Sequence, residues 1–296
     1  MSVGNFDGVH RAHRRVLSEI TEEARRRDAR SVAVTFEPHP MRILRPDAGL
    51  KLLTPTPEKI RLLAETSIDA VLLLPFTRDL SLMSPRDFVQ HILCGGLKAA
   101  EVHEGFNFHF GHKAAGNVTL LTELGREIGF EVAVYPEMKL RGESVSSTRI
   151  RELVREGEVE RARALLNRPF SISSTPGRGR GYGAKYTVPT INLSRYEELV
   201  PKDGVYITRT RVGEECFDSV TNIGNRPTFG ADSFAIETHL LDFHPLELTG
   251  ETEIGLTFLS RLREEIRFGS VDALRDQIAK DIRKARRYFG LMELRG

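Results

Sequence analysis

Two histidines follow a glycine-bounded turn near the start of the chain, in the run Gly4-Asn-Phe-Asp-Gly-Val-His-Arg-Ala-His13. Gly4 and Gly8 allow the backbone to turn tightly. His10 and His13 are three residues apart, which places both on one face of the first turn of the helix that follows. Free N–H groups and the positive end of the helix dipole favour an anion there, and two imidazoles would add donors to a phosphate. The pattern favours a phosphate site, with a surface turn carrying two solvated histidines as the alternative.

Two later loops contain residues that suit the same site. Phe36-Glu-Pro-His-Pro40 follows a strand-like run, at the position where loops of open α/β sheets bind ligands, although a rigid proline loop is the alternative. Gly105-Phe-Asn-Phe-His-Phe-Gly111 combines aromatic residues with glycines. Its alternative interpretation is a buried loop of packed phenylalanines.

The segment Ser146-Ser-Thr-Arg-Ile-Arg-Glu152 is typical of a helix start. Ser147 or Thr148 would cap the helix. Arg149 and Arg151 beside these hydroxyls also suit a polyphosphate, because guanidinium groups form charge-assisted bonds with phosphate oxygens. Plain capping is the alternative.

Glycines alternate with larger residues later in the chain, where Gly179, Gly181 and Gly183 enclose Arg180 and Tyr182. Alternating glycines expose N–H groups that can surround a phosphate. A flexible linker or an Arg/Gly stretch that binds RNA is the alternative.

Polar side chains on two further strand-like runs suit a cation and a proton transfer. Thr190 and Asn192 lie two residues apart on an extended Pro-Thr-Ile-Asn segment, so their oxygens point the same way and could both reach a hard cation. By alternation, Glu237 shares a strand face with Ala235 and His239. A plain strand entry and a solvated glutamate are the alternatives.

The elements that must position these residues differ between the two halves of the chain. In the first half, strand-like runs alternate with amphipathic helical patterns, which implies parallel pairing with right-handed crossovers and a Rossmann-like α/β sheet. The expected strands cover 31–36, 71–76 and 130–135, and the expected helices cover 16–24, 86–93, 117–128 and the segment after 147.

From about residue 170 short β-rich runs dominate, which favours an antiparallel barrel or sandwich. Leu274, Ile278 and Ile282 recur every four residues and predict an amphipathic C-terminal helix. Pro169 interrupts a helical pattern, so we expect two domains, 1–167 and 168–296. The expected strands cover 204–209, 216–224, 234–241 and 253–259.

Taken in order, the histidine turn, the Phe-Glu-Pro-His-Pro run and the Ser-Ser-Thr-Arg-Ile-Arg run resemble the adenylyltransferase half of bacterial FAD synthetases, which carry a His-x-Gly-His signature. The resemblance implies that His10 and His13 contact the phosphates of ATP and that Asn107 helps to hold the substrates. The phosphate of FMN would attack the α-phosphorus of ATP without a covalent intermediate, so catalysis would depend on positioning and charge neutralisation. The other residues that the resemblance places at this site are Gly4, Asn5, Phe6, Gly8, Ser147, Thr148 and Arg151.

The second half resembles the riboflavin kinase half of the same enzymes, through the glycine-rich loop, Pro189-Thr-Ile-Asn192, Asn222-Ile-Gly-Asn-Arg-Pro-Thr-Phe229 and a glutamate before His-Leu-Leu-Asp-Phe. By this resemblance Thr190 and Asn192 hold the Mg²⁺ of MgATP, and Glu237 is the general base for the riboflavin 5′-hydroxyl. The remaining residues implied for this site are Gly179, Gly181, Gly183, Asn222 and Arg226.

We therefore expect a bifunctional enzyme that phosphorylates riboflavin to FMN and adenylylates FMN to FAD. Two features depart from the family pattern: the signature glycine is Ala12, and only three residues precede Gly4. A methyl group at Ala12 would crowd a nucleotide close to the backbone, and the first strand should be weak. The alternative is a riboflavin kinase whose first domain is impaired.

The bulk composition limits the remaining classes. The 43 Lys and Arg residues nearly balance the 41 Asp and Glu residues, which argues against a nucleic-acid-binding regulator. No apolar run approaches the roughly 20 residues that span a bilayer, and two cysteines are too few for a disulfide framework, so we expect a cytoplasmic protein without membrane partners. His103, His109 and His112 lack Cys or carboxylate partners at ligand spacing, which argues against zinc. The sequence does not decide whether the protein forms a homo-oligomer.

Overall fold

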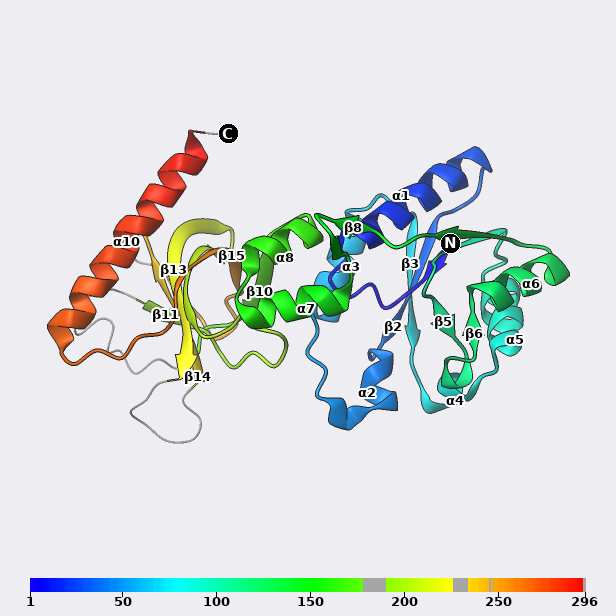
Figure 1. The fold of residues 1–296 in the computed structure, drawn as a ribbon, viewed down its shortest axis with the longest axis horizontal. Coiled ribbons are helices and arrows are strands. Elements are labelled where there is room, and N and C mark those ends of the chain that lie inside the picture. The colour runs from blue at the N-terminus through cyan, green and yellow to red at the C-terminus, as the bar shows by residue number, and fades with distance from the viewer. Residues whose placement is uncertain (178–189, 226–233, 245, 247, 295–296) are drawn as a thin grey trace. The chain divides into compact units, whose positions relative to one another are not determined.

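The structure is a computed structural model that describes residues 1–177, 190–225, 234–244, 246 and 248–294. The chain divides into two compact units, Met1–Arg149 and Ile150–Gly296, each with its own sheet and helices (Figure 1). Among the described helices, none combines the length and the apolar character needed to cross a membrane.

Five short parallel strands form the sheet of the first unit. They are β1 (Ser2–Val3), β2 (Val32–Glu37), β3 (Ala70–Pro75), β4 (Glu101–Gly105) and β7 (Glu131–Tyr135). Strands β1, β2 and β3 pair in parallel, as do β4 and β7. Backbone bonds from Met1 N to Glu101 O and from His103 N to Met1 O, both 2.8 Å, join β1 to β4. The strand order is therefore β3-β2-β1-β4-β7, which confirms the expected α/β sheet.

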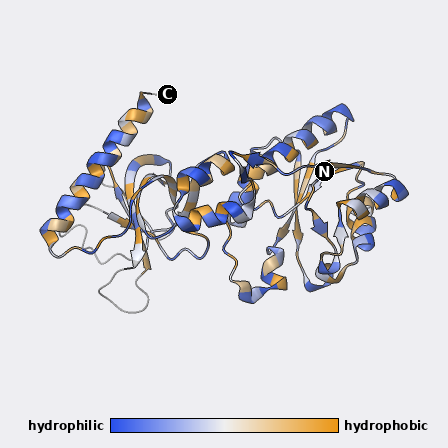
Figure 2. Ribbon diagram, viewed as in Figure 1, coloured by the Kyte–Doolittle hydropathy of each residue, from blue (hydrophilic) through white to orange (hydrophobic). Residues whose placement is uncertain are grey.

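Helices cover both faces of this sheet. They are α1 (Arg11–Arg26), α2 (Pro40–Leu44), α3 (Thr56–Ala64), α4 (Arg78–Leu82), α5 (Pro85–Asp87), the π-helix η2 (Phe88–Gly96) and α6 (Val118–Ile128). Ala33 and Val34 are neighbours on β2 and point to opposite faces. Ala33 shares a buried cluster with Leu17 of α1 and Leu62 of α3, whereas Val34 shares one with Leu121 of α6. The sheet is thus doubly wound, and Figure 2 shows that the visible side of α1 is largely hydrophilic.

Short elements fill the connections of the first unit. They are the 3₁₀ turns η1 (Pro46–Ala48) and η3 (His112–Ala114), and the hairpins β5 (His109–Phe110) with β6 (Gly116–Asn117) and β8 (Lys139–Leu140) with β9 (Glu143–Ser144).

A curled antiparallel sheet dominates the second unit, after helices α7 (Ser147–Glu156) and α8 (Val159–Leu166). Its strands are β10 (Phe170–Ser174), β11 (Thr190–Asn192), β12 (Gly204–Val212), β13 (Glu215–Asn225), β14 (Phe234–Leu240) and β15 (Ile254–Arg263), in the order β10-β15-β12-β13-β14-β11. The inner face buries Tyr206 and Phe258 completely. The expected antiparallel β fold is confirmed.

Helix α10 (Val271–Glu293) closes the second unit, and its buried face differs from the expected one. Leu274 is 40% exposed, whereas Ala285 and Phe289 are buried against Ile207 and Leu259. Asp281 is also buried and forms an ion pair with Arg263 at 2.8 Å. The helix packs on the sheet through this ion pair and through the apolar residues near its C-terminal end. The expected apolar face is therefore wrong at Leu274.

Candidate functional site

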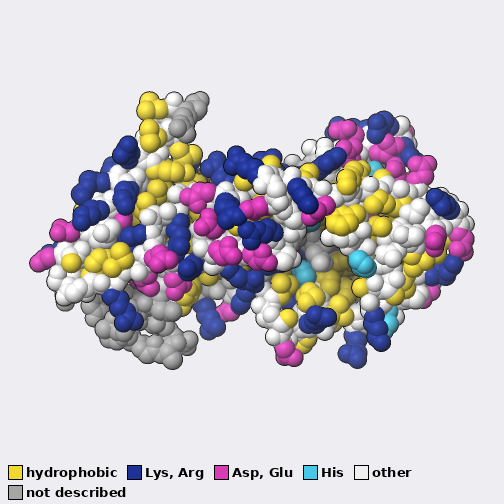
Figure 3. Space-filling model, in the orientation of Figure 1, with side chains coloured by type: hydrophobic (Ala, Val, Ile, Leu, Met, Phe, Trp, Pro, Cys, Tyr) yellow, Lys and Arg dark blue, Asp and Glu magenta, His cyan; other side chains and the backbone are white. Residues whose placement is uncertain are grey.

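The first site lies where the strand order of the first sheet reverses. The chain passes from β1 to β2 and β3 on one side and then returns to β4 on the other side of β1. In open α/β sheets ligands bind in the crevice outside the carboxyl ends of the strands at such a switch point. The loops that follow β1 and β4 contain the histidine turn and Asn107. Figure 3 shows histidine side chains at the rim of a hollow in this unit.

The turn after β1 is held in a rarely populated backbone conformation. Phe6, Gly8 and Val9 have positive φ angles of 47°, 86° and 37°. Asp7, 2% exposed, accepts hydrogen bonds from Leu53 N at 3.1 Å and from Thr54 N at 2.9 Å. Bonds from a buried carboxylate to a second loop therefore stabilise a turn that is locally strained.

His10 lies just before α1, which corrects the expectation that both histidines belong to its first turn. His10 is the N-cap, and its Nδ1 accepts a hydrogen bond from His13 N at 3.4 Å. The two rings stack with centroids 3.6 Å apart. Burial, followed by the neighbouring His10, lowers the pKa of His13 well below its usual value. His13 is thus held neutral, and its Nδ1 is buried without a hydrogen-bond partner among the described residues.

The start of α7 is tied to the same turn. Ser147 Oγ donates to the carbonyl oxygen of Asp7 at 2.8 Å. Ser146 Oγ, rather than Ser147 or Thr148, accepts from Arg149 N at 3.3 Å, so the expected cap is wrong by one residue. Thr148 is exposed, and Arg151, one turn further along the helix, is buried. The hydroxyls expected at the site therefore do not serve as caps.

The other turn and loop residues expected at this site have simpler surroundings. Asn5 is exposed, and Gly4 N donates to Val34 O at 2.9 Å. Asn107 is exposed in the loop after β4, where its carbonyl oxygen lies 2.9 Å from His109 Nδ1. Ala12 is partly buried in the first turn of α1.

Sequence reasoning missed a buried lysine that binds the end of β2 and, through Thr35, supports the loop after β1. Lys59 Nζ, on α3, donates to Thr35 Oγ1 at 3.1 Å and to Phe36 O at 3.2 Å. Thr35 Oγ1 in turn donates to Asn5 O at 3.2 Å. Burial lowers the pKa of Lys59, and the negative charges of Glu37 and Asp7 oppose this shift. A charged residue inside a short amphipathic helix gives no local signal for such a role.

The second site lies on the outer face of the curled sheet. Glu237 on β14 is the direct partner of Asn192 on β11 and of Asn222 on β13. Directly opposed residues of antiparallel strands point to the same face, so these three side chains form a row across three strands. His239 and Thr190 are paired in the next position on that face. The buried neighbours Ile236 and Thr238 face the interior, which confirms the alternation expected for Glu237.

A cavity of about 330 Å³ adjoins this row, and Asn192 and Phe234 are among the residues that line it. Gly177 also lines it, and a Cβ atom at Gly177 would lie 2.6 Å from Leu193 O, so only glycine permits this backbone approach. Gly179, Gly181, Gly183 and Arg226, which were expected at this site, lie outside the described residues.

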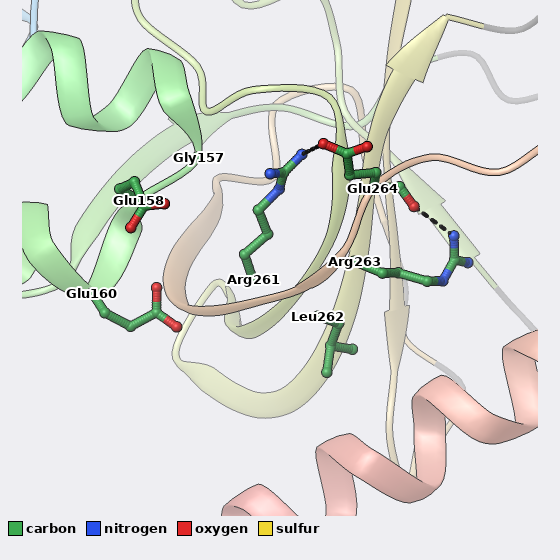
Figure 4. A pocket seen from close by; sticks show the side chains of 7 residues that line it. All are labelled: Gly157, Glu158, Glu160, Arg261, Leu262, Arg263 and Glu264. Atoms are coloured by element: carbon green, nitrogen blue, oxygen red, sulfur yellow. Dashed lines mark hydrogen bonds and ion pairs between the residues drawn. The ribbon is translucent and has the colours of Figure 1, made fainter.

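A separate cavity of about 350 Å³ lies beside β15 and the start of α8 (Figure 4). Its cations already have protein partners, since Arg261 Nη2 donates to Asp203 O at 2.8 Å and Arg263 pairs with Asp281. Three glutamates share the lining: Glu158, Glu160 and Glu264. This mixture of paired charges favours a structural role.

The described residues contain no group of three or more His, Cys, Asp or Glu side chains that could hold a metal ion by themselves. Thr190 and Asn192, with hydroxyl and amide oxygens on one strand face, fit a hard cation that also binds phosphate oxygens.

Comparison with known proteins identifies the family. Residues 1–149 match the family model of FAD synthetase, and residues 166–289 match that of riboflavin kinase. The chain is 35% identical to the bifunctional riboflavin kinase/FMN adenylyltransferase of Escherichia coli (strain K12), over 98% of this chain and 93% of that protein. It is 34% identical to the protein of the same name from Listeria monocytogenes, over 99% and 93%.

A solved structure described as a macrolide-efflux protein from Streptococcus pneumoniae is also similar, with a TM-score of 0.87 and 26% identity over 96% of this chain and 93% of that one. Both family models and the curated relatives name flavin chemistry instead. The chain therefore belongs to the bifunctional riboflavin kinase/FMN adenylyltransferases, with an FAD synthetase domain in its first half and a riboflavin kinase domain in its second.

Proposed function

We propose that the chain makes FMN from riboflavin and FAD from FMN, with ATP as the second substrate at two separate sites. The observation that carries the proposal is that each family model covers one of the two clusters described above. The alternative, a kinase with an impaired first domain, is less well supported, because the FAD synthetase model covers the histidine turn and Ala12 together.

In the first unit, His10 and the neutral His13 donate hydrogen bonds to the phosphates of ATP. Ser147 and Thr148 at the start of α7 add further donors, and Asn107 helps to hold the substrates. A phosphate oxygen of FMN attacks the α-phosphorus of ATP, and pyrophosphate leaves. The side chains orient the two phosphates and neutralise their charge, which is the main source of rate in such a transfer.

In the second unit, Glu237 takes the proton of the riboflavin 5′-hydroxyl, whose oxygen attacks the γ-phosphorus of ATP. ADP leaves with the electron pair of the broken bond. Asn222 beside Glu237 orients the reacting groups. Thr190 and Asn192 would hold Mg²⁺, which supplies positive charge to the phosphates when it is bound. The ring of Phe234, 45% exposed at the cavity, offers a surface for a planar flavin or adenine ring.

We test the proposal by incubating the purified protein with riboflavin, ATP and Mg²⁺ and separating the flavins by chromatography. FMN followed by FAD is expected, and chelation of Mg²⁺ should stop FMN formation. FMN alone would favour the alternative. Absence of any flavin product from the folded protein would overturn the proposal. We also propose a cytoplasmic location, which the few cysteines support.

A further inference from the structure

Strands β1 and β4 stop pairing at Val3 and Glu104, just before the loops at the switch point of the first unit. In a parallel ladder, alternate residues of one strand donate to and accept from the next strand. His103 N follows this pattern and donates to Met1 O. Val3 N, the next amide of β1 that faces β4, donates instead to Glu104 Oε1 at 2.7 Å. Ser2 Oγ donates to the same oxygen at 3.5 Å. The side chain of Glu104 thus occupies the place of a backbone bond.

The other half of this missing ladder step is Gly105 N. By alternation along β4 it faces β1, as His103 N does, and in the part of the chain that the structure describes β1 and β4 form no paired ladder at this point. Gly4 N, by contrast, still donates to Val34 O at 2.9 Å. Strand β1 therefore stays paired with β2 while it parts from β4 at Glu104.

The carboxyl group of Glu104 lies deep between the two strands. The residue is 3% exposed, and burial raises the pKa of Glu104 well above its usual value, opposed by the hydrogen bond from Val3 N. The neutral form is thus favoured, so a glutamine should reproduce its contacts.

Directly beyond this point the two strands lead into the loops of the proposed site. Val3 precedes the turn that carries His10 and His13, and Glu104 lies three residues before Asn107. The distance between β1 and β4 at Val3 and Glu104 therefore sets the distance between the two loops.

We propose that Glu104 is a positioning residue for the adenylyl transfer, which keeps β1 and β4 apart and so sets the spacing between the histidine turn and the Asn107 loop. This inference rests on the proposed function. If Glu104 were replaced by an apolar residue, Val3 N and Gly105 N would pair with the facing strand, and the two loops would approach each other.

The test compares Glu104→Gln, which keeps the acceptor for Val3 N, with Glu104→Val, which removes it. For FAD formation from supplied FMN we expect Glu104→Gln to stay within about 3-fold of the wild type. We expect Glu104→Val to lose roughly 10-fold or more in kcat, with little change in KM, because each loop keeps its own contacts while their spacing changes. Urea unfolding reports on the folding of the first unit, and FMN formation by the same protein reports on the second. Glu131→Gln at the far end of β7 serves as the matched control.

Hydrogen exchange of the Gly105 amide gives a readout independent of activity. We expect fast exchange in the wild type and in Glu104→Gln, and protection in Glu104→Val as the ladder closes. Full FAD synthesis by Glu104→Val, or an equal loss in Glu104→Gln, would overturn the inference. If the wild type made no FAD, the proposed function would fail, while the exchange data would still decide whether Glu104 separates the strands.

Discussion

The turn that carries His10 and His13, which we propose to bind the phosphates of ATP, is held by contacts with a distant loop. Asp7 binds Leu53 N and Thr54 N, and Gly8 N donates to Thr54 Oγ1 at 2.9 Å, so the turn is fixed by a loop 46 residues away in the sequence. The motif that contains Asp7 was evident from the sequence, and its resemblance indicated the site. The partners of Asp7 were not, because contacts between distant loops leave no local pattern.

We predict that Asp7→Asn impairs FAD formation while FMN formation stays within about 2-fold. The asparagine NH₂ group would face the amide of Leu53 or Thr54 and leave a buried donor without an acceptor, which costs about 1–3 kcal/mol. FAD formation from FMN should fall by about 10-fold, and the first unit should unfold at lower urea concentration. Asp69→Asn is the matched control, since Asp69 also binds a backbone amide, Ser31 N at 2.7 Å, outside the turn. Equal losses in both variants would contradict a specific role of Asp7.

We predict that the stability of the first unit falls as the pH falls below about 6.5. The folded state keeps His13 neutral, and it lowers the pKa of His103 to about 4, chiefly through burial. At these two histidines the unfolded chain therefore binds more protons in this range, and acid favours unfolding. The raised pKa of Glu104 acts in the opposite direction and reduces the net effect. Urea unfolding between pH 8 and pH 5 should show this loss, and His13→Gln should reduce its slope. The same slope in the wild type and in His13→Gln would contradict the buried neutral state of His13.

At the scale of elements, periodicity identified the long helices α1, α6 and α10 and the strands β2, β3, β7 and β12 to β15, but it missed α3, α8 and the strand that creates the switch point, β4. Strand β4 reads Glu-Val-His-Glu-Gly, and three of its residues are charged or titratable. The side chains of His103 and Glu104 have neighbouring partners, such as Tyr135 Oη at 2.8 Å from His103 Nδ1, which the sequence alone does not reveal. The apolar face of α10 was misjudged at Leu274 for a similar reason, because a buried ion pair replaces part of the apolar face.

The face of α10 can be tested by two truncations. Phe289→Ala should destabilise the second unit by about 3–5 kcal/mol, because the ring is 5% exposed and packs with Ile207 and Leu259. Leu274→Ala, at a residue 40% exposed, should cost about 0.5 kcal/mol. Thermal unfolding, monitored by the loss of FMN formation, measures the destabilisation in both variants. Similar losses in the two variants would show that the helix packs through the face expected from the sequence.

At the scale of the molecule, the two proposed activities rest on separate cores. The histidine turn packs with α1 and α3, whereas Glu237 lies on a sheet whose core includes Tyr206 and Phe258. The change from alternating strands and helices to short β runs predicted this division, because each pattern requires its own kind of sheet. It follows that damage to one site should leave the other active.

We therefore predict that Glu237→Gln and His13→Asn are complementary. Loss of the general base should reduce FMN formation by about 100-fold or more, with FAD formation from supplied FMN within about 2-fold. His13→Asn should do the reverse, because it removes an imidazole from the phosphates of ATP. A mixture of the two proteins should convert riboflavin to FAD after a lag that shortens as protein concentration rises, since FMN must diffuse between molecules. Flavin chromatography over time measures this lag. A mixture that forms FMN but no FAD would mean that FMN reaches the first site only from the same chain, and a Glu237→Gln protein without either activity would contradict separate sites.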